Sequence, residues 1–341
     1  MQDARSPWWR RGLWNGALLG TLAIAAVLAL NHQELPGLGR ILADLPYAVA
    51  ISAAVHLPQI VFTALGWRAL LPPASRPRIL AMVALRWYRE AASALLPAGA
   101  LVGQAAAARL LIRRGVPGDL ATATATVDVT MEALSQLFFT LAGVALLLLG
   151  RDTGGLTGFA LAGLAIALAC AAAMVLVTRS LPLDLLERGL ARLARRWPAI
   201  RPESVRGLQS AILALHANRP RLLAALLWHS ASWLAGALEI AGVLALLGHP
   251  ISLADALVIE ALAQALRNAG FLLPGALAVQ EGAIIGAAAL VGVPPGAALA
   301  VALVRRSREV AFSLPGLLAW QRAETKAMRT PTVTVVAKET S

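Results

Sequence analysis

The sequence predicts an all-α membrane protein with about six full transmembrane helices, two helical re-entrant hairpins in inverted-topology repeats, and both termini cytoplasmic. Three observations predict this fold class. The chain is 58% hydrophobic and 14% charged, too apolar to cover itself with polar surface as a soluble globule. Several long stretches carry no charged side chain. Two others combine a Pro/Gly break with polar residues in apolar sequence, and an internal repeat relates them.

The internal repeat becomes visible when the sequence is shifted by about 177 residues. Four motifs then coincide: Leu95-Leu96-Pro97 with Leu272-Leu273-Pro274, Gln104 with Glu281, Gly115-Val116-Pro117 with Gly292-Val293-Pro294, and Glu132 with Glu309. Roughly a third of positions 95–142 match without a gap. We therefore expect a single transmembrane domain, 1–322, with two related halves at about 13–150 and about 221–322.

The first half begins with two uncharged stretches, residues 13–31 and 45–67, each long enough for one crossing. A third helix, from Ile79 to Pro97, carries three charged side chains at helical spacing, so that they share one face inside the membrane: Arg86, Arg89 and Glu90. Pro97 and Gly99 then interrupt the helix.

A shorter helix from about residue 100 returns towards Arg113-Arg114. Arginines flanking a span favour the cytoplasm, so this pair of helices is predicted to enter and leave on one side. A long helix from Asp119 to about Gly150 follows, with Asp128 and Glu132 on one face. A further crossing is expected at 153–178.

Residues 181–220 alternate leucines with arginines and form the predicted linker between the halves. The pattern predicts two amphipathic helices on the cytoplasmic surface, with arginines facing anionic lipid headgroups.

The second half starts with a crossing from Arg221 to about Leu247. The next helix, 253–273, presents Glu260, Gln264, Arg267 and Asn268 on one side before Pro274 and Gly275 break it. A short helix follows with Gln280 and Glu281, and the last crossing carries Arg305, Arg308 and Glu309. Residues 323–341 are predicted to be a polar disordered tail.

The net charge of +12 reflects arginines that sort by membrane side, and we expect no nucleic-acid partner. In the predicted topology, most of the arginine-rich loops lie on the same side of the membrane as the N-terminus. Basic loops favour the cytoplasm, which predicts cytoplasmic termini. The first hairpin then enters from the cytoplasm and the second from outside. Broken helices in inverted halves are typical of secondary transporters that bind substrate near the midplane.

An ion in hydrocarbon costs at least about 2.5–3.5 kcal/mol, so the intramembrane charges must neutralise one another. They are either ion pairs holding the two halves together or the lining of a polar substrate cavity. Arginine forks bind phosphate or carboxylate, which favours a polar lipid headgroup. The predicted substrate-binding residues are Arg86, Arg89, Glu90, Gln104, Arg109, Asp128, Glu132, Arg267, Asn268, Gln280, Glu281, Arg305, Arg308 and Glu309, with hairpin breaks at Pro97, Gly99, Pro274 and Gly275.

Motifs of the common enzyme classes are missing: there is no phosphate-binding G-x-x-x-x-G-K loop, no H-E-x-x-H and no G-x-S-x-G. The single cysteine, Cys170, supports neither a disulfide nor a metal cluster. We therefore expect no catalytic residue, metal or cofactor. His229 fits a packed, hydrogen-bonded core histidine better than a proton relay.

The chain resembles the flippase-like membrane family related to the transmembrane region of lysylphosphatidylglycerol synthases, and within it hopanoid-biosynthesis-associated proteins. The motifs that carry the likeness are Arg89-Glu90, Val127-Asp128-Val129-Thr130-Met131-Glu132, Leu247-Gly248-His249-Pro250, Leu273-Pro274-Gly275 with Gln280-Glu281-Gly282, and Arg305 to Glu309. The family commonly has an acidic residue where Gln104 stands. The resemblance implies a multi-pass protein of the bacterial inner membrane without the synthases' aminoacyl-transfer domain.

The predicted function is that of a lipid translocase, which moves or hands over a hopanoid, phospholipid or polyprenyl lipid, driven by the lipid gradient, a proton or a partner. Two alternatives stay open. One is an intramembrane enzyme that modifies a lipid headgroup, with Glu281 or Glu132 as general base. The other is a scaffold for lipid-biosynthesis enzymes through the linker 181–220. A homo-oligomer is a further expected partner state.

Overall fold

The computed structural model describes residues 35–96, 99–150, 207–269 and 276–329, and these ranges are helical, with no strand among them. Several predicted features lie outside the described residues: the crossings at 13–31 and 153–178, most of the linker 181–220, the breaks Pro97, Pro274 and Gly275, and residues 330–341. Three of the described helices are long and apolar enough to cross a membrane, within Leu45–Leu70, Gly118–Leu149 and Arg219–Leu246.

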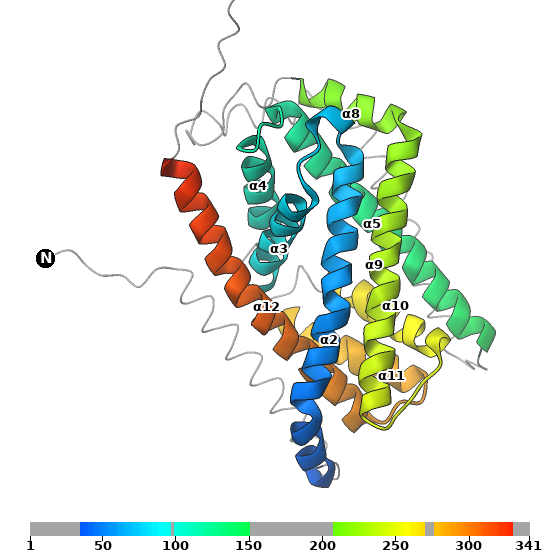
Figure 1. Ribbon diagram of the computed structural model, residues 1–341. Coiled ribbons are helices and arrows are strands. Elements are labelled where there is room, and N and C mark those ends of the chain that lie inside the picture. The colour runs from blue at the N-terminus through cyan, green and yellow to red at the C-terminus, as the bar shows by residue number, and fades with distance from the viewer. Residues whose placement is uncertain (1–34, 97–98, 151–206, 270–275, 330–341) are drawn as a thin grey trace, which may run out of the picture.

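Two long helices, α2 (Leu35–Leu70) and α9 (Arg219–Leu246), lie side by side along much of their length and run in opposite directions (Figure 1). Phe62 and Trp228 stack between them, with ring centroids 5.6 Å apart. The pair forms the axis around which the other helices are arranged.

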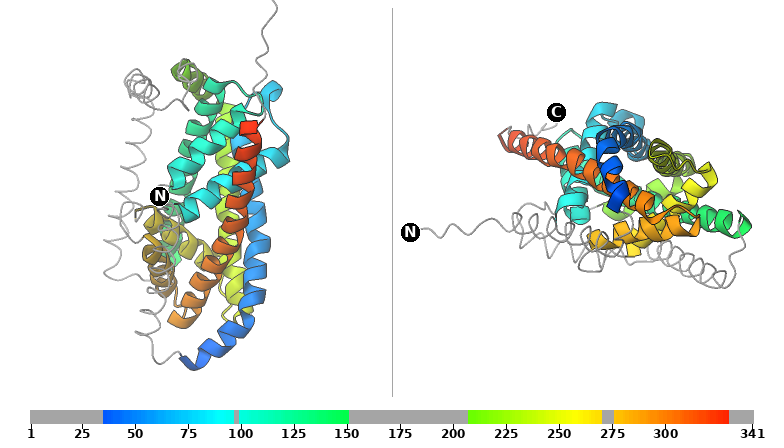
Figure 2. Two further views of the ribbon diagram at one scale, coloured as in Figure 1. Left: turned by 90° about the vertical axis from the view of Figure 1, so that its left-hand side faces the viewer. Right: turned by 90° about the horizontal axis from the view of Figure 1, so that it is seen from below.

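The helices α3 (Ile79–Leu95) and α4 (Gly99–Ile112) form an antiparallel pair at the end of the bundle where α2 finishes (Figure 1). The short turn η2 (Pro73–Ser75) precedes them. Helix α3 stops near the middle of the bundle and α4 returns to the same end (Figure 1). Helix α5 (Gly118–Gly150) then runs to the opposite end (Figures 1 and 2).

The second group mirrors this arrangement. After the short helix α8 (Leu208–Ala217), α9 runs to the lower end in Figure 1, where α10 (Leu253–Ala269) begins. Helix α10 stops near the middle and α11 (Ala276–Leu290) packs back against it. Helix α12 (Pro295–Arg329) then runs to the upper end. The two short antiparallel pairs therefore start from opposite ends of the bundle.

The internal repeat extends further in the structure than in the sequence. Residues match only from position 95 onward, but helix boundaries correspond from α2 to α5. With the same shift of about 177 residues, α2, α3, α4 and α5 fall on 212–247, 256–272, 276–289 and 295–327. The helices found there are α9, α10, α11 and α12. The turns before α5 and α12 also match, because Gly115 and Gly292 both have positive φ, 89° and 80°. The repeated unit therefore comprises four helices.

Two boundaries differ from expectation. Helix α2 begins at Leu35, ten residues before the predicted crossing at 45–67, and includes Pro46 and Pro58. Helix α12 continues to Arg329, although we expected a polar tail from residue 323. The extension is explained by its contacts: Trp320 donates a hydrogen bond to Glu324, and Glu324 pairs with Arg109 of α4.

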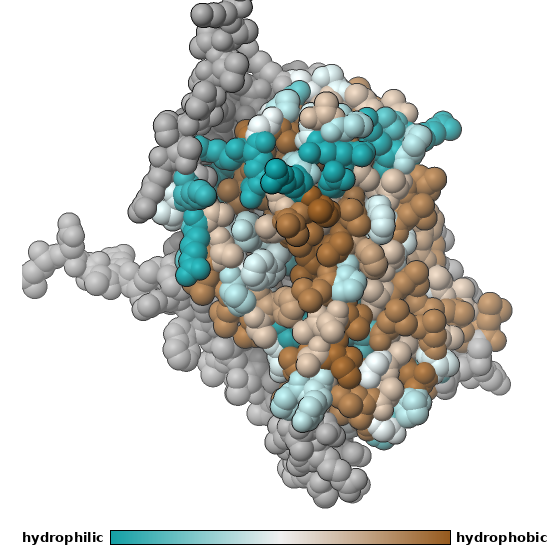
Figure 3. Space-filling model, in the orientation of Figure 1, coloured by the Kyte–Doolittle hydropathy of each residue, from teal (hydrophilic) through white to brown (hydrophobic). Residues whose placement is uncertain are grey.

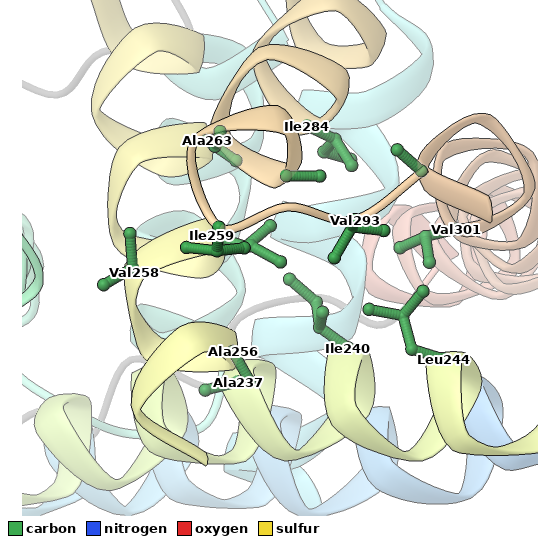
Figure 4. Packing of buried hydrophobic residues seen from close by; sticks show 14 of the residues in the cluster. Ala237, Ile240, Leu244, Ala256, Val258, Ile259, Ala263, Ile284, Val293 and Val301 are labelled. Carbon is green, nitrogen blue, oxygen red and sulfur yellow. The ribbon is translucent and has the colours of Figure 1, made fainter. Parts of the chain in front are cut away.

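Small and branched side chains fill the core of the second unit (Figure 4). Ala237 and Ile240 of α9 meet Ala256 and Ile259 of α10, and Ile284 of α11 packs onto the same cluster. Because most of these residues are small, the helix backbones approach closely, as is common where helices pack within membranes.

Surface hydropathy divides the face seen in Figure 3 into two zones. Hydrophilic residues gather at the end where α2 finishes and α9 begins, and hydrophobic residues cover the middle. The arginines at this end include Arg68, Arg76, Arg78 and Arg221. Partial desolvation and the neighbouring guanidinium groups of Arg68 and Arg221 lower the pKa of Arg76.

Glycine lets α3 and α4 pack in direct backbone contact. A Cβ at Gly103 would lie 2.7 Å from the carbonyl oxygen of Arg89. We expect Gly103→Ala to lower the free energy of unfolding by about 1–3 kcal/mol, because α3 must shift. Unfolding of the purified protein in detergent, titrated with SDS, measures this.

The matched control for that experiment is Gly282→Ala on α11, where a Cβ meets no atom within 4 Å. Alanine is the better helix former by about 0.5–1 kcal/mol, so this variant should be as stable as the parent or more so. Equal stability of the Gly103 and Gly282 variants would contradict the close packing of α3 and α4.

Candidate functional site

Two arginines of α3 and two carboxylates of α5 form the first buried cluster. Arg86 Nη1 lies 3.3 Å from Asp128 Oδ2, and its Nη2 lies 2.6 Å from Glu132 Oε1. Arg89 repeats the arrangement: its Nη1 lies 3.2 Å from the same Asp128 Oδ2, and its Nη2 lies 2.6 Å from Glu132 Oε2. The i, i+3 spacing on α3 matches the i, i+4 spacing on α5, so both forks bridge both acids.

Asp128 also receives a contact from the second unit. Its Oδ1 lies 2.9 Å from His229 Nε2 on α9, and both side chains are almost completely buried. Gly66 provides the space for this imidazole, since a Cβ there would lie 3.1 Å from Nε2. His229 is therefore a hydrogen-bonded core histidine, as the sequence favoured, but its partner is Asp128.

The second cluster lies among α9, α10 and α12. Arg305 Nη2 is 2.6 Å from Glu260 Oε2, and its Nε is 3.5 Å from Glu239 Oε1. Arg308 Nε is 3.4 Å from the same Glu239 oxygen. Gly236 makes room for the cluster, because a Cβ would lie 2.6 Å from Glu260 Oε1.

A third group extends this cluster towards α11. Arg306 donates from Nε and Nη2 to Glu281 Oε1, at 2.9 Å and 2.6 Å, and from Nη1 to Glu309 Oε2 at 2.9 Å. Arg267 reaches Glu309 at 4.0 Å and is 41% exposed. Arg306, which was not among the predicted site residues, is thus the main partner of Glu281.

Polar side chains of α2 connect the two clusters. Ser52 and Gln59 donate to the two oxygens of Glu239, at 2.6 Å and 3.2 Å. The side-chain amide oxygen of Gln59 is 3.1 Å from His56 Nδ1, and His56 Nε2 is 3.4 Å from Glu90 Oε2. Glu90 Oε1 lies 3.6 Å from Arg86 Nε. A continuous polar network therefore links the arginines of α3 with Arg305 and Arg308 of α12. The group around Arg306 is joined to it through α12, and we call the two together the network.

Four predicted site residues are not part of this network. Arg109 is 45% exposed and pairs with Glu324 near the end of α12. Gln104 donates a hydrogen bond to the Ala125 carbonyl. Gln280 is half-buried and makes no polar contact with the network among the described residues, and the side chain of Asn268 lies outside those residues. The predicted site residues of the second half do not contact one another as one group, because Arg305 and Arg308 contact Glu239 and Glu260 while Glu281 contacts Arg306.

Sequence reasoning did not include seven members of the network among the site residues: Ser52, His56, Gln59, His229, Glu239, Glu260 and Arg306. A usable signal existed on α2. Its polar residues at positions 52, 56, 59 and 63 repeat at helical spacing in a stretch with no formal charge. Such a stripe in a membrane-spanning helix indicates polar partners on neighbouring helices.

Within the described residues, the arginine–carboxylate pairs of the network join helices of the same four-helix unit. Contacts between the units are hydrogen bonds such as those of Ser52, Gln59 and His229. The expected role of the charges as salt bridges between the halves therefore does not fit the network. Arg109 with Glu324 does bridge the units, near their ends.

Comparison with known families supplies the relationship. The profile of the lysylphosphatidylglycerol synthase TM region matches residues 14–316, which is most of the chain. The protein belongs to this family. No match was found among curated proteins or among solved structures. Family membership and the long apolar helices together make this a membrane protein of the lysylphosphatidylglycerol synthase TM family.

The network places unusual demands on stability. Breaking a buried ion pair by removing one partner costs about 3–5 kcal/mol, because the other charge stays buried. Arg305→Met should cost this much, since it deprives Glu260 of its arginine. Adding Glu260→Gln should recover a large part of the loss. SDS titration of the purified variants in detergent gives both values.

The Arg109–Glu324 pair provides the reference for the Arg305 and Glu260 variants. Arg109 is 45% exposed, so Arg109→Gln should cost at most about 1 kcal/mol. Additive losses for Arg305→Met and Glu260→Gln, with no recovery in the double variant, would mean that the two side chains do not form a buried pair.

Proposed function

We propose that the protein moves a polar-headed lipid across or within the bacterial inner membrane, and that the headgroup passes through the ion-pair network. The observation that carries this proposal is the position of the network. It connects α3 of the α3–α4 pair with α10 of the α10–α11 pair, and these two short helix pairs begin at opposite ends of the bundle (Figure 1). In the membrane these pairs are two re-entrant hairpins of an inverted repeat.

Stability alone gives no reason for such a network. Each ion at membrane depth costs at least about 2.5–3.5 kcal/mol to insert. Well-packed hydrophobic residues in place of a buried ion pair are often neutral or stabilising. Charged groups retained at this depth therefore support a path for a polar group. Interrupted helices in inverted halves, with polar residues near the midplane, are the arrangement of many secondary transporters.

The orientation follows from the arginine-rich end. Arg68, Arg78 and Arg221 lie at the end where α2 finishes, and such residues favour the cytoplasmic side. The α3–α4 hairpin then opens from the cytoplasm and the α10–α11 hairpin from the opposite side. The two termini, which lie outside the described residues, would both be cytoplasmic.

The distribution of contacts supports movement of the two units against each other. Each unit keeps the buried arginine–carboxylate pairs of the network within itself, and only the exposed Arg109–Glu324 pair outside the network bridges the described parts of the two units. Across the boundary, α9 and α2 exchange hydrogen bonds, for example Ser52 to Glu239. A hydrogen bond to a charged group contributes about 1.5–3 kcal/mol, less than breaking a buried ion pair costs. Rocking of one unit against the other would therefore leave the ion pairs intact.

The unpaired atoms of the network indicate the headgroup chemistry. Arg308 Nη1 is buried and has no acceptor among the described residues, and Glu281 Oε2 is buried with no donor there. An anionic oxygen of a headgroup would satisfy Arg308 Nη1, and a hydroxyl or amine donor would satisfy Glu281 Oε2. The family's name concerns lysylphosphatidylglycerol, a phospholipid that carries both kinds of group. Phospholipids therefore lead the candidate substrates, with polyprenyl lipids and hopanoids as further members of the class.

Arg308 provides the functional test. Proteoliposomes containing fluorescent phosphatidylglycerol report movement between leaflets. We expect Arg308→Ala to slow this movement about tenfold or more, because one charge-assisted contact is worth about 1.5–3 kcal/mol. Arg308→Lys keeps the charge but loses the fork, so its rate should lie between the two.

Arg109→Gln is the control for the Arg308 test, because it removes an arginine that the structure places outside the network. Its rate should equal that of the parent. Equal rates for the Arg308 and Arg109 variants would contradict a headgroup path through the network. Chemical conversion of the lipid in detergent, where there are no leaflets, would indicate an enzyme instead.

The inverted orientation has its own test. Pro117 and Pro294 occupy equivalent, exposed positions in the turns before α5 and α12. In a Cys170→Ser background, Pro117→Cys should react with an impermeant thiol reagent from the cytoplasmic side only, and Pro294→Cys from the other side only. Labelling of both from one side would contradict the inverted repeat.

A further inference from the structure

We propose that His56 and Glu90 together hold one exchangeable proton, and that this proton controls the hydrogen bond between Gln59 and Glu239 that joins the two four-helix units. The inference rests on the proposed function only where it assigns the proton to the transport cycle. The proton site itself follows from the hydrogen-bond pattern around His56.

The carboxylate of Glu239 fixes the orientation of the Gln59 amide. Glu239 is 1% exposed and lies 3.5 Å from Arg305 Nε and 3.4 Å from Arg308 Nε. With two guanidinium groups at this distance it is a carboxylate, which only accepts hydrogen bonds. Its contact with Gln59 at 3.2 Å therefore uses the amide nitrogen of Gln59 as donor.

The Gln59 amide in turn determines which nitrogen of His56 carries a hydrogen. With its nitrogen turned to Glu239, Gln59 presents its carbonyl oxygen to His56 Nδ1 at 3.1 Å. A carbonyl oxygen cannot donate, so Nδ1 must carry the hydrogen. In a neutral imidazole, the other ring nitrogen then carries none.

The extra proton lies between His56 and Glu90. His56 Nε2 is 3.4 Å from Glu90 Oε2. A neutral His56 facing an ionised Glu90 would set a lone pair against a lone pair. One more proton, either on Nε2 or on the Glu90 carboxyl, turns this repulsion into an attraction. The side chains are 16% and 30% exposed, so the pair is not sealed inside the bundle.

The charge balance of the network agrees with one added proton. Among the described residues, the network contains six arginines and seven carboxylates. The arginines are Arg86, Arg89, Arg267, Arg305, Arg306 and Arg308, and the acids are Glu90, Asp128, Glu132, Glu239, Glu260, Glu281 and Glu309. One carboxylate is in excess, and one proton neutralises it. Uncompensated charge is costly at membrane depth.

His229 is the competing place for this proton, and its surroundings disfavour it. Its Nε2 contacts Asp128, while its Nδ1 is buried with no partner among the described residues. An imidazolium would bury an N–H donor that has no acceptor, which costs about 1–3 kcal/mol. His56 has a partner for each ring nitrogen, so the charged or hydrogen-sharing form is satisfied there.

Other groups that face the pair come from each neighbouring helix. Arg86 and Glu132 approach Glu90 on the side of α3 and α5, and Arg308 of α12 and Glu239 of α9 act on it from the second unit. The ring of Phe312 on α12 packs edge-on against His56, with centroids 5.4 Å apart. The pair thus lies where both units meet.

Loss of the proton has a structural consequence. When it leaves to water, neutral His56 must move its hydrogen to Nε2 to face the Glu90 carboxylate. Nδ1 then has a lone pair towards the Gln59 oxygen, so the Gln59 amide must turn. Turning it removes the donor from Glu239 and breaks the bond between the units. The protonated pair would hold the units together, and the deprotonated pair would release them.

The proton site is tested on the full-length protein in detergent, without lipid transport. In ¹⁵N-histidine-labelled protein we expect an imidazolium signal that His56→Gln removes, or an infrared band of a carboxylic acid that Glu90→Gln removes. His249→Gln, at an exposed loop position, should remove neither. A neutral His56 together with an ionised Glu90 across the pH range in which the protein stays folded would overturn the proposal.

The coupling is tested in proteoliposomes with fluorescent phosphatidylglycerol. A pH difference across the membrane should change the rate of lipid movement in the parent and in His249→Gln, and His56→Gln should lose this response. If lipid moves but its rate ignores the pH difference, the coupling is wrong. If no lipid moves under any condition, the proposed function fails, while the spectroscopic experiment still decides whether the proton site exists.

Discussion

Charge neutralisation at membrane depth is the constraint on which the rest of the structure depends. The bundle carries arginines and carboxylates on α3, α5, α9, α10, α11 and α12, and many of these side chains are buried away from water. Each ion there needs a partner at hydrogen-bonding distance. The helix positions are consistent with this need. Glycines at positions 66 and 236 bring helices close enough for His229 and Glu260 to reach their partners.

The repeat explains why the network has two clusters. Helices α2 to α5 and α9 to α12 correspond one to one, and the central pair α2 and α9 runs antiparallel (Figure 1). An arrangement of this kind brings the same parts of both units to the middle of the bundle. The charges themselves have diverged, since Asp128 of α5 corresponds to Arg305 of α12 in the repeat. The architecture is shared by the units, but the chemistry of each cluster is its own.

The helices and the repeat could be predicted from the sequence because their signals are local. Apolar length, the Pro97 and Pro274 breaks and the Gly115 and Gly292 turns each act within a few residues. The partners in the network depend on how helices far apart in sequence rotate and pack, which periodicity does not specify. Arg109 was assigned to the site as one of the arginines within apolar sequence, and its actual partner, Glu324, lies in a part of α12 that was expected to be a polar tail. His56 was not assigned to the site because the assignment started from charged residues, and an isolated histidine in an apolar stretch gives no such signal.

The distribution of ion pairs between the units has a consequence for how the protein is made. Arg86 and Arg89 find their acids on α5, so the first four described helices already hold most of their compensating charges before α9 is synthesised. Arg305 and Arg306 likewise find theirs within α9 to α12. Each unit can therefore enter the bilayer during translation without waiting for the other. Assembly would then be completed by docking of two pre-formed parts, with late steps that form hydrogen bonds such as Ser52 to Glu239 and the exposed Arg109–Glu324 pair.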